Sequence, residues 1–372
     1  MSVLASLFVW WAALANAGTP VGEFTIGWGV NVNDPVQRQI SEAIEEYLTS
    51  SDPSVREAGT VLWCEEDQSK RHQYDLTEPW VYKGVRATLL EITPTSTDSS
   101  EYWIKTLYAA TVQNGIQPFG VQRLLARREY GRWVLCGALD RMTSAWNRQV
   151  VGDISYRYPD EWIFDRRKAE VAAAFVGRVA TDFGVSEGPP IEYFLAPTPE
   201  ALARTIGLDW TIPGVRGKTY ASDRLIFVGD LDQGEMYLHE LVHIVLSPLE
   251  PADGWHPLVS EGVASWLGGS RGLSFAALID ELLQYQFANP EVEFQEIVDK
   301  TRHRAEVGYN SGALIMECLF RKGGVVAVKR ALETVDSNEA VYSLLESEFG
   351  IGEAGATEWW RTTTRVLADE SK

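Results

Sequence analysis

The pattern of apolar and polar positions divides the chain into two parts that differ in the secondary structure they predict. Residues 36–48 repeat apolar side chains at the spacing of an amphipathic helix. Four strand-like stretches follow, at 84–92, 101–112, 118–125 and 133–138. One helix followed by several consecutive strands predicts an α+β unit with a single curved antiparallel sheet.

From about residue 150 the pattern becomes mainly helical. Residues 165–183 form an amphipathic helix, and short strands are predicted at 191–195 and 225–228. Further helices are predicted at 234–247, 258–268, 273–287, 309–321, 324–334, 338–348 and 356–367. The fold class is therefore expected to be α+β, with a first domain at 18–150 and a mainly helical second domain with a small sheet at 151–372.

The N-terminus begins with an uncharged apolar run at residues 3–15, which ends in the cleavage pattern Ala15-Asn16-Ala17. The run is shorter than the roughly 20 residues that span a bilayer as a helix. No Lys or Arg precedes it, so an N-terminal anchor or a buried first helix is the alternative. The pattern favours a signal peptide at 1–17 and a secreted or periplasmic protein without a membrane span after its removal.

Composition narrows the classes of partner. The 372 residues carry a formal net charge of -19, and such an acidic surface repels nucleic-acid phosphates and anionic lipids. Three cysteines are too few for a disulfide-dense scaffold or a zinc cluster built from cysteine. Cys64 and Cys136 lie in strand-like contexts of the same half of the chain and could pair after export. Three buried free thiols are the alternative, and the sequence leaves both open.

The segment His239-Glu240-Leu241-Val242-His243 carries the strongest chemical signal. Residues four apart share one face of a helix, so both imidazoles can bind one metal ion, with Glu240 beside them as general base. A zinc hydrolase needs a third protein ligand and an open fourth position. Glu261 follows His243 by 18 positions, after a Pro- and Gly-rich loop, and is the candidate. His256, within that loop, is the rival third ligand.

The paired motifs His239-Glu240-Leu241-Val242-His243 and Glu261-Gly262-Val263-Ala264 resemble those of the gluzincin zinc peptidases, the peptidase-MA-like group. The resemblance covers roughly residues 190–335. It implies a zincin-like fold in which His239, His243 and Glu261 are the ligands of Zn²⁺.

The same resemblance implies two further features. Tyr309, in the pattern Tyr309-Asn310-Ser311-Gly312, looks like the tyrosine whose hydroxyl stabilises the oxyanion in related aminopeptidases; the alternative is a core aromatic. Residues 224–230 occupy the place of the edge strand beside which an extended peptide adds. The element order of the first domain is similar to that of the SnoaL-like (nuclear transport factor-like) fold.

The sequence therefore predicts an exported zinc metallopeptidase that hydrolyses peptide bonds with a zinc-activated water, Glu240 being the general base. The alternative is a catalytically inactive zincin-fold module that binds metal or protein. No G-x-M-E-N element accompanies the motif, so an aminopeptidase assignment is not supported. The substrate, the choice between endo- and exo-cleavage, the oligomeric state and the role of the first domain stay open.

Overall fold

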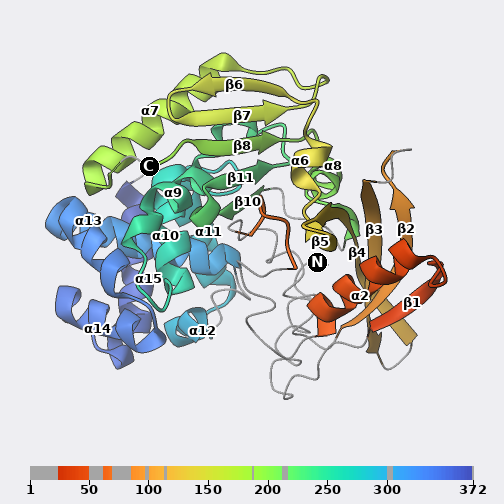
Figure 1. The fold of residues 1–372 in the computed structure, drawn as a ribbon. Coiled ribbons are helices and arrows are strands. Elements are labelled where there is room, and N and C mark those ends of the chain that lie inside the picture. The colour runs from red at the N-terminus through yellow and green to blue at the C-terminus, as the bar shows by residue number, and fades with distance from the viewer. Residues whose placement is uncertain are drawn as a thin grey trace.

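The computed structural model describes residues 24–49, 62–68, 85–96, 100–112, 115–186, 188–211, 217–299 and 305–370. The predicted signal peptide at 1–17 lies outside these residues. Across the described part the chain is α+β, as the hydrophobic pattern predicts: two mixed sheets come first and a helical half follows (Figure 1). No helix of the described part is long and apolar enough to cross a membrane.

The first sheet has the order β1-β2-β3-β4-β5, with β9 paired to β4 outside this path. Its strands are β1 (Phe24–Gly29), β2 (Arg86–Pro94), β3 (Glu101–Val112), β4 (Gly115–Glu129), β5 (Arg132–Cys136) and β9 (Leu208–Thr211). Only β1 and β2 run parallel among its described pairs; the others are antiparallel. Helix α2 (Pro35–Thr49) begins after Asp34, whose carboxylate accepts the N–H of Val36, and buries Ile40 and Ile44 in the core of this sheet.

The second sheet has the order β10-β11-β8-β7-β6. Its strands are β6 (Asn147–Val151), β7 (Ile154–Tyr158), β8 (Ile191–Leu195), β10 (Gly217–Tyr220) and β11 (Leu225–Val228). The predicted strands at 191–195 and 225–228 are confirmed. The division expected at 150/151 falls inside β6, and a division before Asn147 keeps this sheet whole.

The helical half contains the segment His239–His243. The α-helices that follow β5 in the chain are α6 (Leu139–Met142), α7 (Arg166–Phe183), α8 (Pro199–Thr205), α9 (Leu238–Leu246), α10 (Pro257–Gly268), α11 (Phe275–Ala288), α12 (Phe294–Asp299), α13 (Ala305–Thr334), α14 (Asn338–Phe349) and α15 (Glu353–Glu370). The helix predicted at 234–247 begins only at Leu238, because Gly234 has a φ of +51° and opens a 3-10 turn. A kink at Gly323 and Gly324 divides α13 as the two predicted helices require.

Helix α9 lies between the second sheet and α10 (Figure 1). Its apolar face, with Leu241, Val242 and Val245, is buried in one core together with Ile226 and Val228 of β11. Because that face is held against the sheet, the opposite face of α9 is fixed toward α10 and the start of α13. The two histidines of the motif are on this opposite face.

Candidate metal centre

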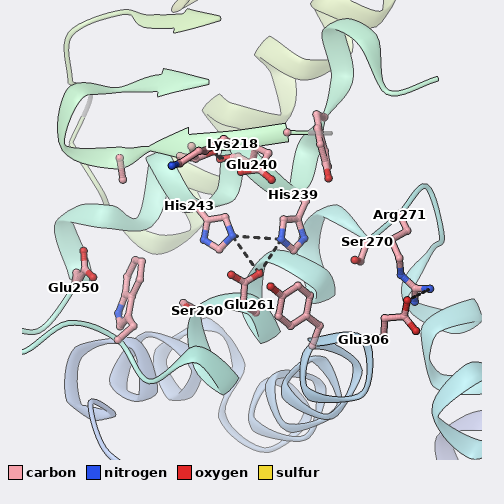
Figure 2. A pocket seen from close by; sticks show the side chains of 16 residues that line it. Lys218, His239, Glu240, His243, Glu250, Ser260, Glu261, Ser270, Arg271 and Glu306 are labelled. Atoms are coloured by element: carbon pink, nitrogen blue, oxygen red, sulfur yellow. Dashed lines mark hydrogen bonds and ion pairs between the residues drawn. The ribbon is translucent and has the colours of Figure 1, made fainter. Parts of the chain in front are cut away.

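Three side chains from α9 and α10 converge on one point (Figure 2). The Nε2 atoms of His239 and His243 lie 3.3 Å apart. Glu261 places Oε2 3.0 Å from Nε2 of His239 and 3.6 Å from Nε2 of His243. The three ligand atoms lie within 4.8 Å of one another, so the group could hold a metal ion.

The charges of this group favour a cation. Burial opposes ionisation of Glu261, but the imidazoles of His243 and His239 outweigh it and hold the pKa of Glu261 well below its usual range. Burial also opposes the charged form of His243, whereas Glu261 and Glu240 raise the pKa of His243. Two imidazole nitrogens and one ionised carboxylate oxygen form a donor set that suits zinc.

A backbone carbonyl orients the first histidine. Nδ1 of His239 lies 2.9 Å from the carbonyl oxygen of Gly269, at the end of α10. When Nδ1–H donates this bond, the lone pair of Nε2 is directed toward Glu261 and His243. Gly268 permits the close approach, because a Cβ there would lie 2.6 Å from the backbone nitrogen of His239. The sequence shows no acidic partner for His239, and a carbonyl partner leaves no sequence signal.

The glycines of the two downstream motifs let α10 and α13 cross closely. A Cβ on Gly262 would lie 2.5 Å from the carbonyl carbon of Gly312, and a Cβ on Gly312 would lie 2.0 Å from the carbonyl oxygen of Leu258. Glu261 precedes one of these glycines and Tyr309 is one turn before the other. The crossing therefore brings the side chains of Glu261 and Tyr309 to the same cavity.

We expect Gly262→Ala to destabilise the protein and displace Glu261. Overpacking a close helix contact costs about 1–3 kcal/mol, because neither backbone can retreat without moving its helix. Chemical denaturation with and without zinc measures both effects. Gly177→Ala on α7 is the control, since that exposed glycine has no atom within 4 Å of its added Cβ and gains helix propensity. Equal stability of the two variants would contradict the packing argument.

Glu240 enters the site from α9 and is held by the neighbouring sheet. Thr219 on β10 donates its hydroxyl to Oε2 of Glu240. The structure also corrects the predicted edge strand: residues 225–228 form β11, which pairs with both β8 and β10. Among the described strands, β10 lies at this edge instead. It escaped prediction because a four-residue strand beginning with glycine has no clear apolar alternation.

Tyr309, on α13, lies beside the three-residue group and lines the same cavity. Its ring is nearly parallel to that of His239, with a centroid distance of 6.1 Å and an interplanar angle of 23°. Burial and the carboxylates of Glu261 and Glu240 raise the pKa of Tyr309. The phenol is therefore protonated at neutral pH and can donate a hydrogen bond, in this structure to Glu261.

His256 is not part of the group, so its rival assignment as third ligand is wrong. The side chain is buried, its Nδ1 accepts the N–H of Leu258 at the start of α10, and its Nε2 lies 2.9 Å from Oδ1 of Asn338. Both ring nitrogens are engaged in fixing the loop and the helix. His256 thus caps α10 and anchors it to α14.

A cavity of about 760 Å³ opens over the three convergent side chains. Figure 2 shows Glu250 at one end, beyond His243, and Ser270, Arg271 and Glu306 at the other end, beyond His239. Lys218, Thr219 and Tyr237 also line it. The sequence could not assign these wall residues, because they come from separate elements without a shared motif.

Comparison with known proteins supplies no family for the chain. No protein-family model matches it, and no curated protein matches it at a significant level.

Proposed function

We propose that this protein is an exported zinc metallopeptidase of the gluzincin type that hydrolyses peptide bonds. The observation that carries the proposal is the convergence of His239, His243 and Glu261 beside Glu240 in an open cavity. When bound, zinc would polarise the substrate carbonyl and acidify the attacking water. The signal-like segment at 1–17 supports export.

Glu240 is the general base in this proposal. Its carboxylate lines the cavity next to His239 and His243, so it can take a proton from the attacking water and return it to the leaving amine. Thr219 fixes the carboxylate by donating a hydrogen bond to Oε2. In this proposal the other carboxylate oxygen takes the proton from the water.

Tyr309 supplies the donor for the developing oxyanion. Its neutral phenol lines the cavity beside Glu261 and His239. A hydrogen bond that strengthens as negative charge forms on the carbonyl oxygen lowers the barrier.

The edge strand β10 supports an extended peptide as substrate. Among the described strands β10 pairs only with β11, and its residues Gly217, Lys218 and Thr219 line the cavity. A peptide that adds along this edge by backbone hydrogen bonds would cross the cavity between Glu240 above and Glu261 below (Figure 2).

Metal analysis and a peptide library test the proposal on the purified protein. We expect about one zinc per chain, cleavage of library peptides, loss of cleavage with a chelator and recovery with added zinc. Bound zinc without any cleavage would favour the inactive binding module instead. Absence of zinc after reconstitution at neutral pH would overturn the metal site itself.

We expect Tyr309→Phe to lower kcat by roughly 100- to 1,000-fold, the range for loss of one oxyanion donor. KM and zinc content should change little, because the phenyl ring keeps its place beside His239. Steady-state kinetics on a cleaved library peptide measures the effect. Tyr130→Phe is the control, since Tyr130 is 88% exposed, lies in the turn between β4 and β5 and does not line the cavity. An unchanged kcat in Tyr309→Phe would show that the hydroxyl has no catalytic role and that Tyr309 is a packing residue.

A further inference from the structure

Two cysteines of the first sheet are brought side by side by a short segment that pairs with β5. Trp63 and Leu135 form a parallel bridge. The N–H of Leu135 donates to the carbonyl of Leu62, and the N–H of Cys64 donates to the carbonyl of Leu135. Cys64 and Cys136 each follow one partner of this bridge. Residues in equivalent positions of parallel neighbours point to the same face of a sheet.

The two sulfur atoms meet in an apolar pocket. Cys64 is fully buried and Cys136 nearly so, and both pack with Leu125 and Val134. Their Sγ atoms and a carboxylate oxygen of Asp67 all lie within 4.8 Å of one another. The two cysteines are thiols in this structure. Neighbouring strands lie about 4.7–4.9 Å apart, which is within the Cα–Cα range of a disulfide.

We propose that Cys64 and Cys136 form a disulfide in the exported protein. The proposal rests on the export proposed above and is independent of the peptidase chemistry. The reaction is exchange with an oxidised disulfide, either a small molecule or a disulfide-donating protein. One S–S bond forms between Cys64 and Cys136, the S–S bond of the oxidant breaks, and the oxidant leaves as two thiols that carry the two protons.

A disulfide fits this cluster better than a second metal ion. Structural zinc is held by four protein ligands, and in the part of the chain that the structure describes the cluster offers three. The third, Asp67, already accepts hydrogen bonds at Oδ2 from the N–H of Gly137, at 2.7 Å, and from Sγ of Cys64, at 3.3 Å. With the disulfide formed, Asp67 keeps the bond from Gly137.

Burial determines when the bond forms. Hydrogen bonding to Cys136, burial and the Asp67 carboxylate raise the pKa of Cys64, so the folded protein holds little thiolate for exchange. The bond therefore forms while the chain folds, before the first sheet closes over the sulfurs. Once formed, it resists reduction, because reductants cannot reach it and Cys64 is a poor leaving thiolate.

Cys318 provides an internal control. It is half-buried on α13, outside the cluster that contains Cys64 and Cys136, and burial raises its pKa to about 12. Because Cys318 lies outside the cluster of Cys64 and Cys136, we expect it to stay a thiol under the same oxidant.

The full chain, exported into an oxidising compartment, is denatured in an alkylating reagent without reductant and analysed by peptide mass spectrometry. We expect alkylation of Cys318 alone and a peptide pair joined through Cys64 and Cys136. Refolding of the reduced chain with oxidised glutathione should restore the same pair, whereas adding the oxidant after folding should leave three thiols.

Three alkylated cysteines in the exported protein would overturn the proposal. If that protein also held a metal ion that Cys136→Ser removes, the cluster would be a metal site instead. The variants give a second readout. Cys64→Ser and Cys136→Ser should each lower the thermal midpoint of the oxidised protein by roughly 5–15 °C, and a reductant present during folding should lower that of the parent to match. Cys318→Ser should keep the parent's response to reductant.

Discussion

Glu240→Gln is expected to keep zinc and lose peptide hydrolysis by at least about 10²- to 10⁴-fold, the usual contribution of a general base. Glutamine has the shape of glutamate, and its amide oxygen still accepts the hydrogen bond from Thr219. The amide cannot take a proton from water, so the first chemical step loses its base. The proposed ligands His239, His243 and Glu261 are unchanged in this variant. The measurements are kcat/KM on a cleaved library peptide and zinc content by elemental analysis.

Glu250→Gln is the matched control, because Glu250 also lines the cavity but is outside the three-ligand group. It removes the same charge and should keep most of the activity. If both variants lost activity equally, the negative charge of the cavity, and not proton transfer by Glu240, would explain the effect. Full activity in Glu240→Gln would show that Glu240 is not the general base.

Local patterns made much of the helical half predictable. The segment around His239 and His243 has an apolar face at helical spacing, so the sequence alone predicts its helix and the shared face of the two imidazoles. Glu261 and Tyr309 also follow from local motifs with recognisable spacing. The structure adds the reason for their glycines, since Gly262 and Gly312 are the contact at which the two helices cross.

Contacts between distant segments were not predictable in the same way. The N–H of Arg123 on β4 donates to the carbonyl of Gly207, and β9 adds to the first sheet although it lies between β8 and β10 of the second sheet in the sequence. The hydroxyl of Thr219 and the carbonyl of Gly269 reach the site only because β10 and the end of α10 pack against α9. His256 shows the converse: its position in a loop near the motif suggested a ligand, but its tertiary partners make it a helix cap.

His243→Ala is expected to abolish tight zinc binding, with a loss of affinity well above 100-fold, because removal of a ligand exceeds the 10- to 100-fold cost of disturbing its supporting contacts. Only His239 and Glu261 then remain, too few for a stable site. Zinc stabilises a folded chain that binds it by about 2.7 kcal/mol at 100 times Kd, and this gain should vanish in the variant. Chemical unfolding with and without zinc measures it.

His256→Ala is the control for His243→Ala, because it removes a histidine that is not a proposed zinc ligand. It should keep zinc and the zinc-dependent gain in stability, while the free energy of unfolding falls by about 1 kcal/mol from the lost cap of α10. Zinc binding to the parent should weaken as the pH falls through the raised pKa of His243, because protons compete for the ligand nitrogen. If His256→Ala lost zinc and His243→Ala kept it, the metal centre would have been assigned to the wrong histidine.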